Sequence, residues 1–424
     1  MCWNAVKSIS NQSRGQTIRD YTRQQAEHNF YITKSLQLYR AYKFIGDDSV
    51  KYTKFNIQCW RKFDRSNLIL LAFGFFSIFV INIFLIFLPL DTDSVIYYTF
   101  DFMSLKQGDD SWGPMSNALV YMQSNHQGNI YDNIFFEQNI KFQYPLTSLL
   151  LMCLLNLVFR QYIDLYILLN LLSFTSVIVT IIFVLKIFRF NLKKNHSSTN
   201  ISTYLILIIY CLTFYPLIKA YTLGQIQTII NCLLTMAFWY WLIDRKKFAG
   251  ILVGAVVLFK PNYLIIILWG FLRKNRCFYI YAMLTIAIGT LISVILFGID
   301  NNIRYLEVIE YISRHGEGFY PNQSINGLLN RLFFNGNNLF FDENSFAPYH
   351  PLIYLGTIIS SMLIIALGLF YPIRYKFAGN AFDFAIIMIT ATVASPIAWE
   401  HHYGILLSIY AYLSSYLMQK LDLN

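Results

Sequence analysis

Long apolar runs separated by short polar stretches fill most of the chain after residue 66. A helix needs about 20 apolar residues to cross a bilayer, so the runs predict about eleven membrane helices, the shorter ones as half-spans. Lipid offers no partners to backbone groups, and helices satisfy those groups internally. We therefore predict an all-α fold, a polytopic membrane helical bundle. The runs are Asn67–Leu90 and roughly 145–159, 163–185, 202–220, 225–243, 249–260, 262–272, 277–298, 351–371, 382–398 and 403–418.

One long polar segment, residues 91–143, interrupts this pattern after the first run. Pro114 suits the first turn of a helix. The apolar residues Met115, Leu119 and Met122 then recur at helical spacing, which predicts an amphipathic helix lying on the membrane. A second amphipathic piece is expected from about Tyr131 to Ile140.

The distribution of charge predicts an orientation. Only 13% of the residues are charged, against roughly 25% in soluble domains, and the formal net charge is +10. Basic residues collect in cytoplasmic loops, which accounts for the excess without a nucleic-acid partner. We expect residues 1–66 to form a basic cytoplasmic N-terminal segment and residues 67–424 to form the membrane domain. Basic clusters that should share the cytoplasmic side are Lys186–Lys194, Arg245–Lys247, Arg273–Arg276 and Arg374–Lys376.

The polar loops between the other helix ends should then lie on the opposite face. These are residues 220–224, the outer loops 91–143 and 299–350, and residues 399–402. One conflict remains in this topology, because two crossings between residues 145 and 185 would put Lys193 and Lys194 outside. Either the run 145–159 is re-entrant, or one of the runs is misdrawn.

Ionisable groups near membrane spans are costly unless they are paired or hydrated, so they are candidates for function. Lys219 follows Tyr215-Pro216 and also has a simpler interpretation, that its side chain reaches out to the membrane surface. Lys260, directly before Pro261, favours a phosphate-binding or interior role. Glu400, His401 and His402 follow Trp399. Adjacent side chains on a helix diverge by about 100°, so the two histidines do not predict a metal site.

The order of several motifs resembles that of glycosyltransferase family 87, multi-pass transferases of the GT-C group that include polyprenol-phosphate-mannose-dependent α-mannosyltransferases. The likeness extends from about residue 67 to residue 415. The motifs are Tyr131-Asp132, Tyr144-Pro145-Leu146, Gly224-Gln225, Ala249–Pro261, Asn322-Gln323-Ser324 with Gly327-Leu328, and Ser395–Tyr403.

This resemblance implies a polyprenyl-phosphate-sugar donor, with mannose favoured, and a lipid or glycan acceptor. It also implies a bacterial plasma membrane and catalysis on the extracytoplasmic face. The family's essential Asp falls on Asp110, with Asp109 beside it. Its Tyr-Pro-Pro appears here as Tyr144-Pro145-Leu146, and its usual Asp before the His pair appears as Glu400. Both departures leave the sugar and the acceptor open.

The expected chemistry is an inverting displacement in which Asp110, or alternatively Asp109, removes the proton of the acceptor hydroxyl. Lys260 and Lys219 would neutralise the departing lipid phosphate. No cofactor or metal is required by this scheme. Further residues expected to bind the donor or acceptor are Tyr144, Gln225, Asn322, Gln323, Arg331, Glu400, His401 and His402.

Two other functions fit a polytopic chain. A transporter or flippase of lipid-linked sugars would also have many spans and buried charges, but such proteins often contain paired repeats, and we find none. A ligase that joins glycans to a lipid or protein would share the architecture and differ in its acceptor.

Overall fold

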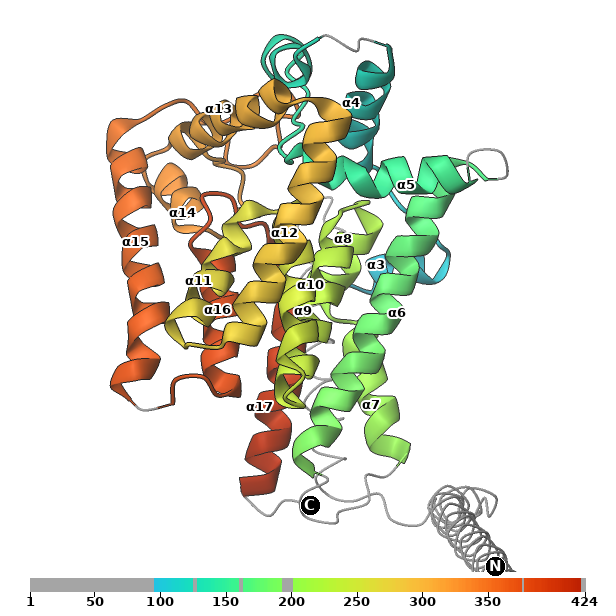
Figure 1. The fold of residues 1–424 in the computed structure, drawn as a ribbon, viewed down its shortest axis with the longest axis vertical. Helices are drawn as coiled ribbons and strands as arrows, with labels where there is room; N and C mark the ends of the chain where they lie inside the picture. Colours follow the sequence, from blue (N-terminus) through green and yellow to red (C-terminus); the bar gives the residue numbers. More distant parts are fainter. Residues whose placement is uncertain (1–94, 125–127, 160–162, 193–200, 376, 421–424) are drawn as a thin grey trace, which may run out of the picture. The chain divides into compact units, whose positions relative to one another are not determined.

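The computed structural model describes residues 95–420, apart from residues 125–127, 160–162, 193–200 and 376. This part of the chain forms helices and no strand, as the predicted all-α fold requires. The predicted N-terminal segment 1–66 and the predicted first span Asn67–Leu90 lie outside the described residues. Figure 1 labels the helices and colours them along the chain, from blue near the N-terminus to red near the C-terminus.

The described part of the chain contains α-helices joined by loops and by short helical turns of other types. In chain order they are α3 Val95–Met103, α4 Trp112–Ser124, η3 Tyr131–Glu137, η4 Leu146–Ser148, α5 Leu149–Phe159, α6 Leu165–Leu192, α7 Ile201–Leu212, α8 Tyr215–Thr222, α9 Gln227–Leu242, α10 Lys246–Phe259, η6 Pro261–Tyr263, α11 Leu264–Leu272, α12 Arg276–Phe297, α13 Ile299–His315, α14 Ile325–Leu332, α15 Pro351–Arg374, α16 Ala381–Val393, η7 Glu400–Ile405 and α17 Leu406–Lys420.

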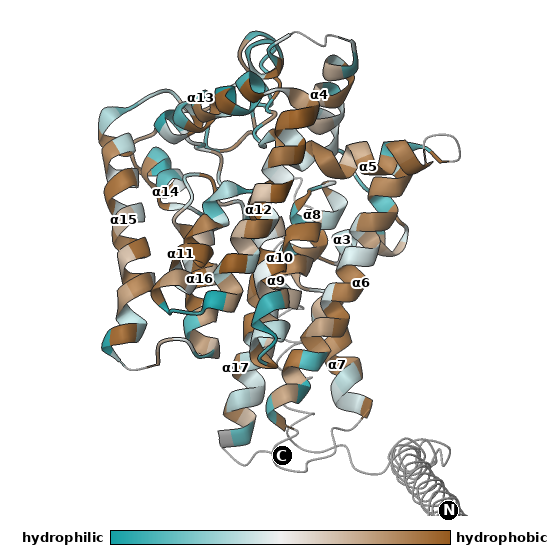
Figure 2. Ribbon diagram, in the orientation of Figure 1, coloured by the Kyte–Doolittle hydropathy of each residue, from teal (hydrophilic) through white to brown (hydrophobic). Residues whose placement is uncertain are grey.

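The structure does not confirm the predicted number of about eleven membrane helices. Among the described helices, α6, α12 and α15 are long and apolar enough to cross a bilayer, and the bent pair α7–α8 makes a fourth if it is one span. Several predicted runs form shorter helices because polar residues or prolines interrupt them. The predicted run 202–220 is one example, because it divides into α7 and α8 just before Pro216. Figure 2 shows that apolar residues nevertheless dominate most of these helices.

Helix α5 agrees with the re-entrant alternative for the predicted run 145–159. It is short, and Figure 1 shows it lying crosswise at the upper end of α6. Only α6 therefore runs the length of the helical unit between residues 145 and 192, and its basic residues Lys186 and Arg189 lie near its lower end. Lys193 and Lys194 lie outside the described residues.

Helices α10 and α12 pack closely because α10 presents two glycines on one face. Gly250 and Gly254 are one helical turn apart, and a Cβ atom on Gly254 would lie 2.6 Å from the carbonyl oxygen of Ala282. A Cβ on Gly250 would collide with the carbonyl of Phe278. Small residues at this spacing let helix backbones approach each other in membranes.

A buried ion pair joins α11 to α16. Arg273 donates from Nε to Asp383 Oδ2 at 2.6 Å and from Nη2 to Oδ1 at 3.0 Å. The same Nη2 donates to the carbonyl of Leu369 in α15. The Asp383 side chain is 0% exposed, so the fork geometry of the guanidinium compensates a carboxylate removed from solvent.

The predicted helices of the polar segment 91–143 are present. Helix α4 begins at Trp112, and a π-helix, η3, covers Tyr131–Glu137. The stripe of Met115, Leu119 and Met122 is buried in the protein core. The prediction that this stripe faces the membrane is therefore wrong, because the neighbouring protein supplies the apolar surface that the stripe needs.

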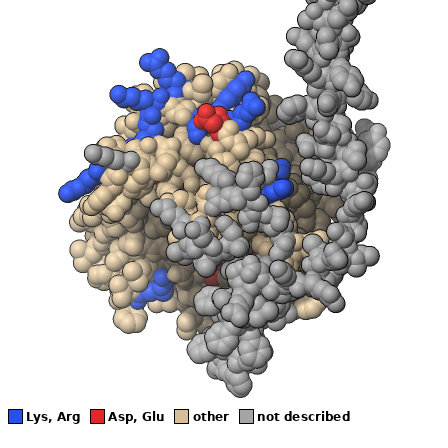
Figure 3. Space-filling view, turned by 90° about the horizontal axis from the view of Figure 1, so that it is seen from below, with Lys and Arg blue, Asp and Glu red and all other residues tan. Residues whose placement is uncertain are grey.

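The basic clusters of the described helices lie at one end of the helical unit, as predicted. Figure 1 places these helix ends away from α4 and α13, and Figure 3 shows Lys and Arg side chains on the face seen from below. The exposed basic side chains at these ends are Lys186, Arg189, Arg245, Lys247, Lys274, Arg276 and Arg374.

Candidate active site

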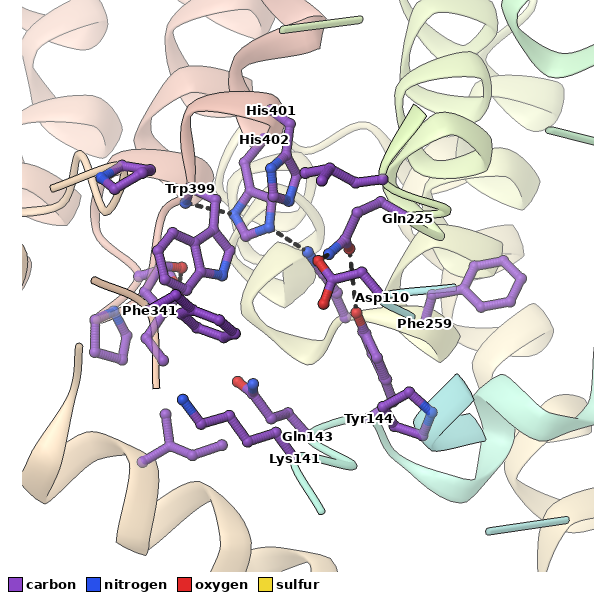
Figure 4. Close-up of a pocket in the computed structure, with 18 of the residues that line it drawn as sticks. Asp110, Lys141, Gln143, Tyr144, Gln225, Phe259, Phe341, Trp399, His401 and His402 are labelled. Atoms are coloured by element: carbon purple, nitrogen blue, oxygen red, sulfur yellow. Dashed lines mark hydrogen bonds between the residues drawn. The ribbon is translucent and has the colours of Figure 1, made fainter. Parts of the chain in front are cut away.

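A cavity of ≈ 1070 Å³ lies where the predicted outer loops converge. The loop before α4, the turn between α8 and α9, the break between α10 and α11, helix α13 and the loop before η7 all line it. Figure 4 shows the two histidines of η7 on one side of the cavity, and Lys141 and Gln143 on another. The predicted site residues that line the cavity are Asp109, Asp110, Tyr144, Lys219, Gln225, Lys260, Glu400, His401 and His402.

Backbone pairing fixes the loop that carries the two aspartates. Gly108 N–H donates to the carbonyl of Thr222 at 2.7 Å, and Asp110 N–H donates to that of Leu223 at 3.0 Å. The partner turn contains Gly224 at φ +70°, and a Cβ there would collide with the backbone of Gly108. Glycine is needed on both counts, for the left-handed conformation and for the close approach.

A chain of hydrogen bonds orients the Asp110 carboxylate. Ile226 N–H donates to Ser111 Oγ, and Ser111 donates to Gln225 Oε1 at 2.7 Å, so the amide nitrogen of Gln225 faces Asp110 and donates to its Oδ2. Tyr144 lies with its hydroxyl 2.7 Å from Ser111 Oγ. Figure 4 shows the side chain of Gln225 next to that of Asp110. Gln225 is buried, so its amide has one orientation that satisfies both partners.

The surroundings of Asp110 make its carboxylate more basic. Desolvation by the surrounding protein raises the pKa of Asp110 above its usual value, and the nearby charge of Asp109 raises it further. The bond from Gln225 opposes these effects. A carboxylate that is oriented, open to a cavity and raised in pKa is suited to remove a proton.

Two of the lysines that line the cavity are already neutralised. Lys219 pairs with Glu400, which also accepts a hydrogen bond from Tyr215. Lys141 Nζ lies 3.1 Å from Glu317 and over the ring of Phe341 at 4.4 Å. The sequence predicts that Lys219 meets the lipid phosphate, but in the structure its charge is held by Glu400.

Lys260 has different partners. It donates to Gln227 Oε1 at 2.9 Å and lies 2.7 Å from His402 Nε2, and within the described part of the chain it forms no ion pair. It caps α10 in an extended conformation, outside the candidate spans. Burial lowers the pKa of Lys260 to about 7, and the charge of Asp110 partly offsets this effect.

The tautomer of His402 constrains the protonation state of Lys260. Trp399 N–H donates to His402 Nδ1 at 3.2 Å, so in the neutral ring the proton resides on Nε2 and points at Lys260 Nζ. An amine that accepts a hydrogen bond from this N–H must be uncharged, so this arrangement corresponds to the neutral form of Lys260. Burial keeps the pKa of His402 well below its usual value, and protonation of Lys260 would lower this pKa further, so the imidazole is neutral in both states of Lys260. A phosphate in the cavity would favour the protonated amine instead.

His401 offers a second buried group toward the cavity. Its ring lies roughly parallel to that of Trp399, with centroids 6.5 Å apart. Among the described residues, no partner reaches its buried Nε2 atom. Buried polar atoms are normally bonded, so the unsatisfied Nε2 atom of His401 is unusual in a residue that lines the cavity.

Three predicted site residues do not line the cavity. Asn322 bonds the backbone of Glu317, Ala398 and Pro396, and so joins the two loops that approach η7. Gln323 and Arg331 bond carbonyls of the same 320–322 turn. These side chains hydrogen-bond to the backbone of loops next to the cavity and do not line it themselves.

Sequence reasoning missed Ser111, Lys141, Gln227 and Phe341. Ser111 directly follows the paired aspartates, and Gln227 is a polar residue inside a predicted apolar run, which is a signal that could have found it. Lys141 and Phe341 carried no such signal. In the part of the chain that the structure describes, no three His, Cys, Asp or Glu side chains are placed to hold a metal ion.

Comparison with known proteins identifies a family. The family model of glycosyltransferase family 87 matches residues 142–396. That stretch contains Lys219, Lys260 and the Gln225 turn, whereas the Asp109-Asp110 loop precedes it. No curated protein and no solved structure matches the chain.

Proposed function

The chain belongs to glycosyltransferase family 87, and on this basis we propose that it moves a hexose from a polyprenyl-phosphate donor to a hydroxyl of a lipid or glycan acceptor. Mannose is the favoured hexose. The proposed setting is a bacterial plasma membrane, with the basic helix ends in the cytoplasm and the cavity on the extracytoplasmic side.

One observation carries this proposal. A basic, oriented carboxylate and an amine without an ion-pair partner among the described residues line the same cavity, where each affects the protonation of the other. Transfer from a lipid phosphate requires a group that accepts a proton and a group that receives developing negative charge. Asp110 and Lys260 supply these two functions.

The proposed reaction is a single displacement. The acceptor oxygen forms a bond to the anomeric carbon while the bond from that carbon to the phosphate oxygen breaks, and its electron pair stays with the phosphate. Asp110 takes the hydroxyl proton, and the Lys260 ammonium stabilises the charge that develops on the phosphate. His401 Nε2 is available to bind a sugar hydroxyl, and the Trp399 ring offers an apolar face.

The Glu400–Lys219 pair has a separate proposed role. Because the two charges cancel, the pair adds a polar surface to the cavity without repelling or holding an anion. Such a surface suits sugar hydroxyls better than a phosphate. We therefore assign the phosphate to Lys260 and a sugar-binding role to Glu400 and Lys219.

The experiment uses purified protein in nanodiscs with a labelled polyprenyl-phosphate mannose. The parent protein should release free polyprenyl phosphate as product forms. Lys260→Ala should raise the KM for the donor by roughly 10- to 100-fold, the effect of losing a bond to a charged group, and leave the KM for the acceptor nearly unchanged. Lys106→Ala is the control, because Lys106 is exposed and outside the cavity.

Release of free polyprenyl phosphate also separates a transferase from a transporter. Movement of the intact donor across the bilayer without release would contradict the proposal. Equal donor KM values for Lys260→Ala and the parent would remove Lys260 from the phosphate site.

A further inference from the structure

Helix α14 buries polar side chains and exposes apolar ones, the reverse of a helix at a water-exposed surface. Its buried residues are Asn326, Gly327 and Asn330, whereas Leu328 and Leu332 are 45% and 63% exposed. A helix at a water-exposed surface buries its apolar side and exposes its polar side. The reverse arrangement in α14 indicates that the medium outside it is apolar.

The segment that follows α14 continues this exposed apolar surface. Phe334 is 86% exposed, and Leu339 and Phe340 are 69% and 72% exposed. Residues 332–341 contain no charged side chain. Large contiguous apolar surfaces of this kind mark contact with a membrane or a partner.

Two polar side chains of the segment, Asn335 and Asn337, bond within the protein, whereas the buried Asn338 Oδ1 has no partner among the described residues. Asn335 donates to the carbonyl of Pro348 at 2.7 Å and to Asn330 Oδ1 at 2.8 Å. Asn337 Oδ1 accepts from the backbone of Leu339 and Phe340. Contact with hydrocarbon demands internal partners of this sort, whereas water would make them unnecessary.

The segment lies beside the start of a candidate membrane span. The ring of Phe333 is 5.3 Å from that of His350, which caps α15, and Asn326 donates to Thr357 within α15. Leu352 of α15 is itself 61% exposed. The apolar surface of residues 328–340 is therefore continuous with the lipid-facing side of α15.

We propose that the exposed apolar side chains of residues 328–340 dock into the acyl region of the membrane leaflet on the cavity side. Arg331, the charged residue in this range, instead turns back to the carbonyls of Tyr320 and Asn322. This inference concerns a lipid surface and does not depend on the proposed reaction. The segment ends at Phe341, which lines the cavity with its ring 5.9 Å from that of Trp399. Docking would therefore fix one wall of the cavity to the leaflet.

The test places tryptophan at two positions, Phe340→Trp and Leu332→Trp, in protein reconstituted in phosphatidylcholine with or without brominated acyl chains. Bromine quenches indole fluorescence only at close range, and the difference from the parent protein removes the signal of the native tryptophans. Leu291→Trp, on the exposed side of candidate span α12, is the lipid-facing control. Arg314→Trp, on the charged surface of α13, is the water-facing control.

The expected result is that brominated lipid quenches the Phe340→Trp and Leu332→Trp variants to the extent seen for Leu291→Trp. Quenching by aqueous iodide, as expected for Arg314→Trp, would overturn the proposal. Protection from both quenchers would also overturn it, because the surface would then be covered by protein, such as a second copy of the chain. Two positions are used so that misfolding of one variant leaves the other informative.

Discussion

Asp110 and Lys260 depart from their usual acidities in opposite directions, and both departures have the same cause. The protein around the cavity disfavours charge, which raises the pKa of the carboxylic acid and lowers that of the ammonium. Their mutual attraction partly restores both charges. The two groups therefore titrate closer to neutrality than the same groups in water, in the range where a small change of pH changes the state of the site.

The pH dependence of kcat/KM follows from these directions. In the proposed reaction Asp110 works in its charged form, so kcat/KM should rise with pH through the raised pKa of Asp110. The proposed phosphate-binding form of Lys260 is also the charged one, so kcat/KM should fall as pH increases beyond its pKa of about 7. In Lys260→Arg the falling limb should move to higher pH, because a guanidinium stays charged. A falling limb that is identical in this variant would contradict the assignment.

Single residues could be predicted as site candidates where their side chains are unusual for an apolar membrane chain. Lys260, Asp110 and the two histidines stand out because ionisable groups are rare in an apolar chain. Their meeting in one site was expected from the family resemblance, whereas the direct contact of Lys260 with His402, 142 positions away in the chain, was not predicted. Asn322, also predicted as a site residue, does not line the cavity. It is polar for a structural reason, since two crossing loops need partners for their backbone groups.

At the scale of elements, short helices and breaks place the functional groups. The break after α10 holds Lys260, the turn between α8 and α9 holds Gln225, and the loop before α4 holds Asp110. Apolar runs located these helices in the sequence. Hydropathy located the break between α10 and α11, but it did not show the break that divides the predicted run 202–220 into α7 and α8.

The buried pair between α11 and α16 should dominate the stability of that region. Arg273→Ala leaves Asp383 without its counter-ion and should lower the free energy of unfolding by about 3–5 kcal/mol. Unfolding in mixed detergent micelles measures this loss. Arg314→Ala removes an exposed pair on α13 and should cost less than about 1 kcal/mol.

The double variant Arg273→Leu/Asp383→Leu separates charge from packing. Replacing both partners removes the cost of burying a lone charge, so most of the lost stability should return. If the double variant is as unstable as Arg273→Ala, the loss in Arg273→Ala does not come from the unpaired charge of Asp383.

At the scale of the whole helical unit, the exposed basic residues and the cavity lie at opposite ends. The exposed basic residues gather at the helix ends seen in Figure 3, and the cavity lies at the ends that carry α4 and α13. The sequence predicted this polarity because basic clusters alternate with polar loops along the chain. It did not predict how the loops close into one cavity, since that depends on distant backbone contacts such as those of residues 108–110 with 222–223.

The proposed orientation can be tested at a native cysteine. Cys277 is exposed and lies at the basic end of α12. A membrane-impermeant maleimide should label it in inverted vesicles and not in sealed cells, with Cys277→Ser as the background. Glu310→Cys, on α13, should show the reverse pattern. Labelling of Cys277 from outside the cell would invert the proposed topology.

The central claim is that Asp110 removes the acceptor proton, and single-turnover transfer by Asp110→Asn tests it most directly. The variant keeps the shape of the side chain, so donor binding should persist while the transfer rate falls by about 10²- to 10⁴-fold. Asp109→Asn is the matched control and should retain much more of the rate. A transfer rate in Asp110→Asn equal to that of the parent would contradict the account.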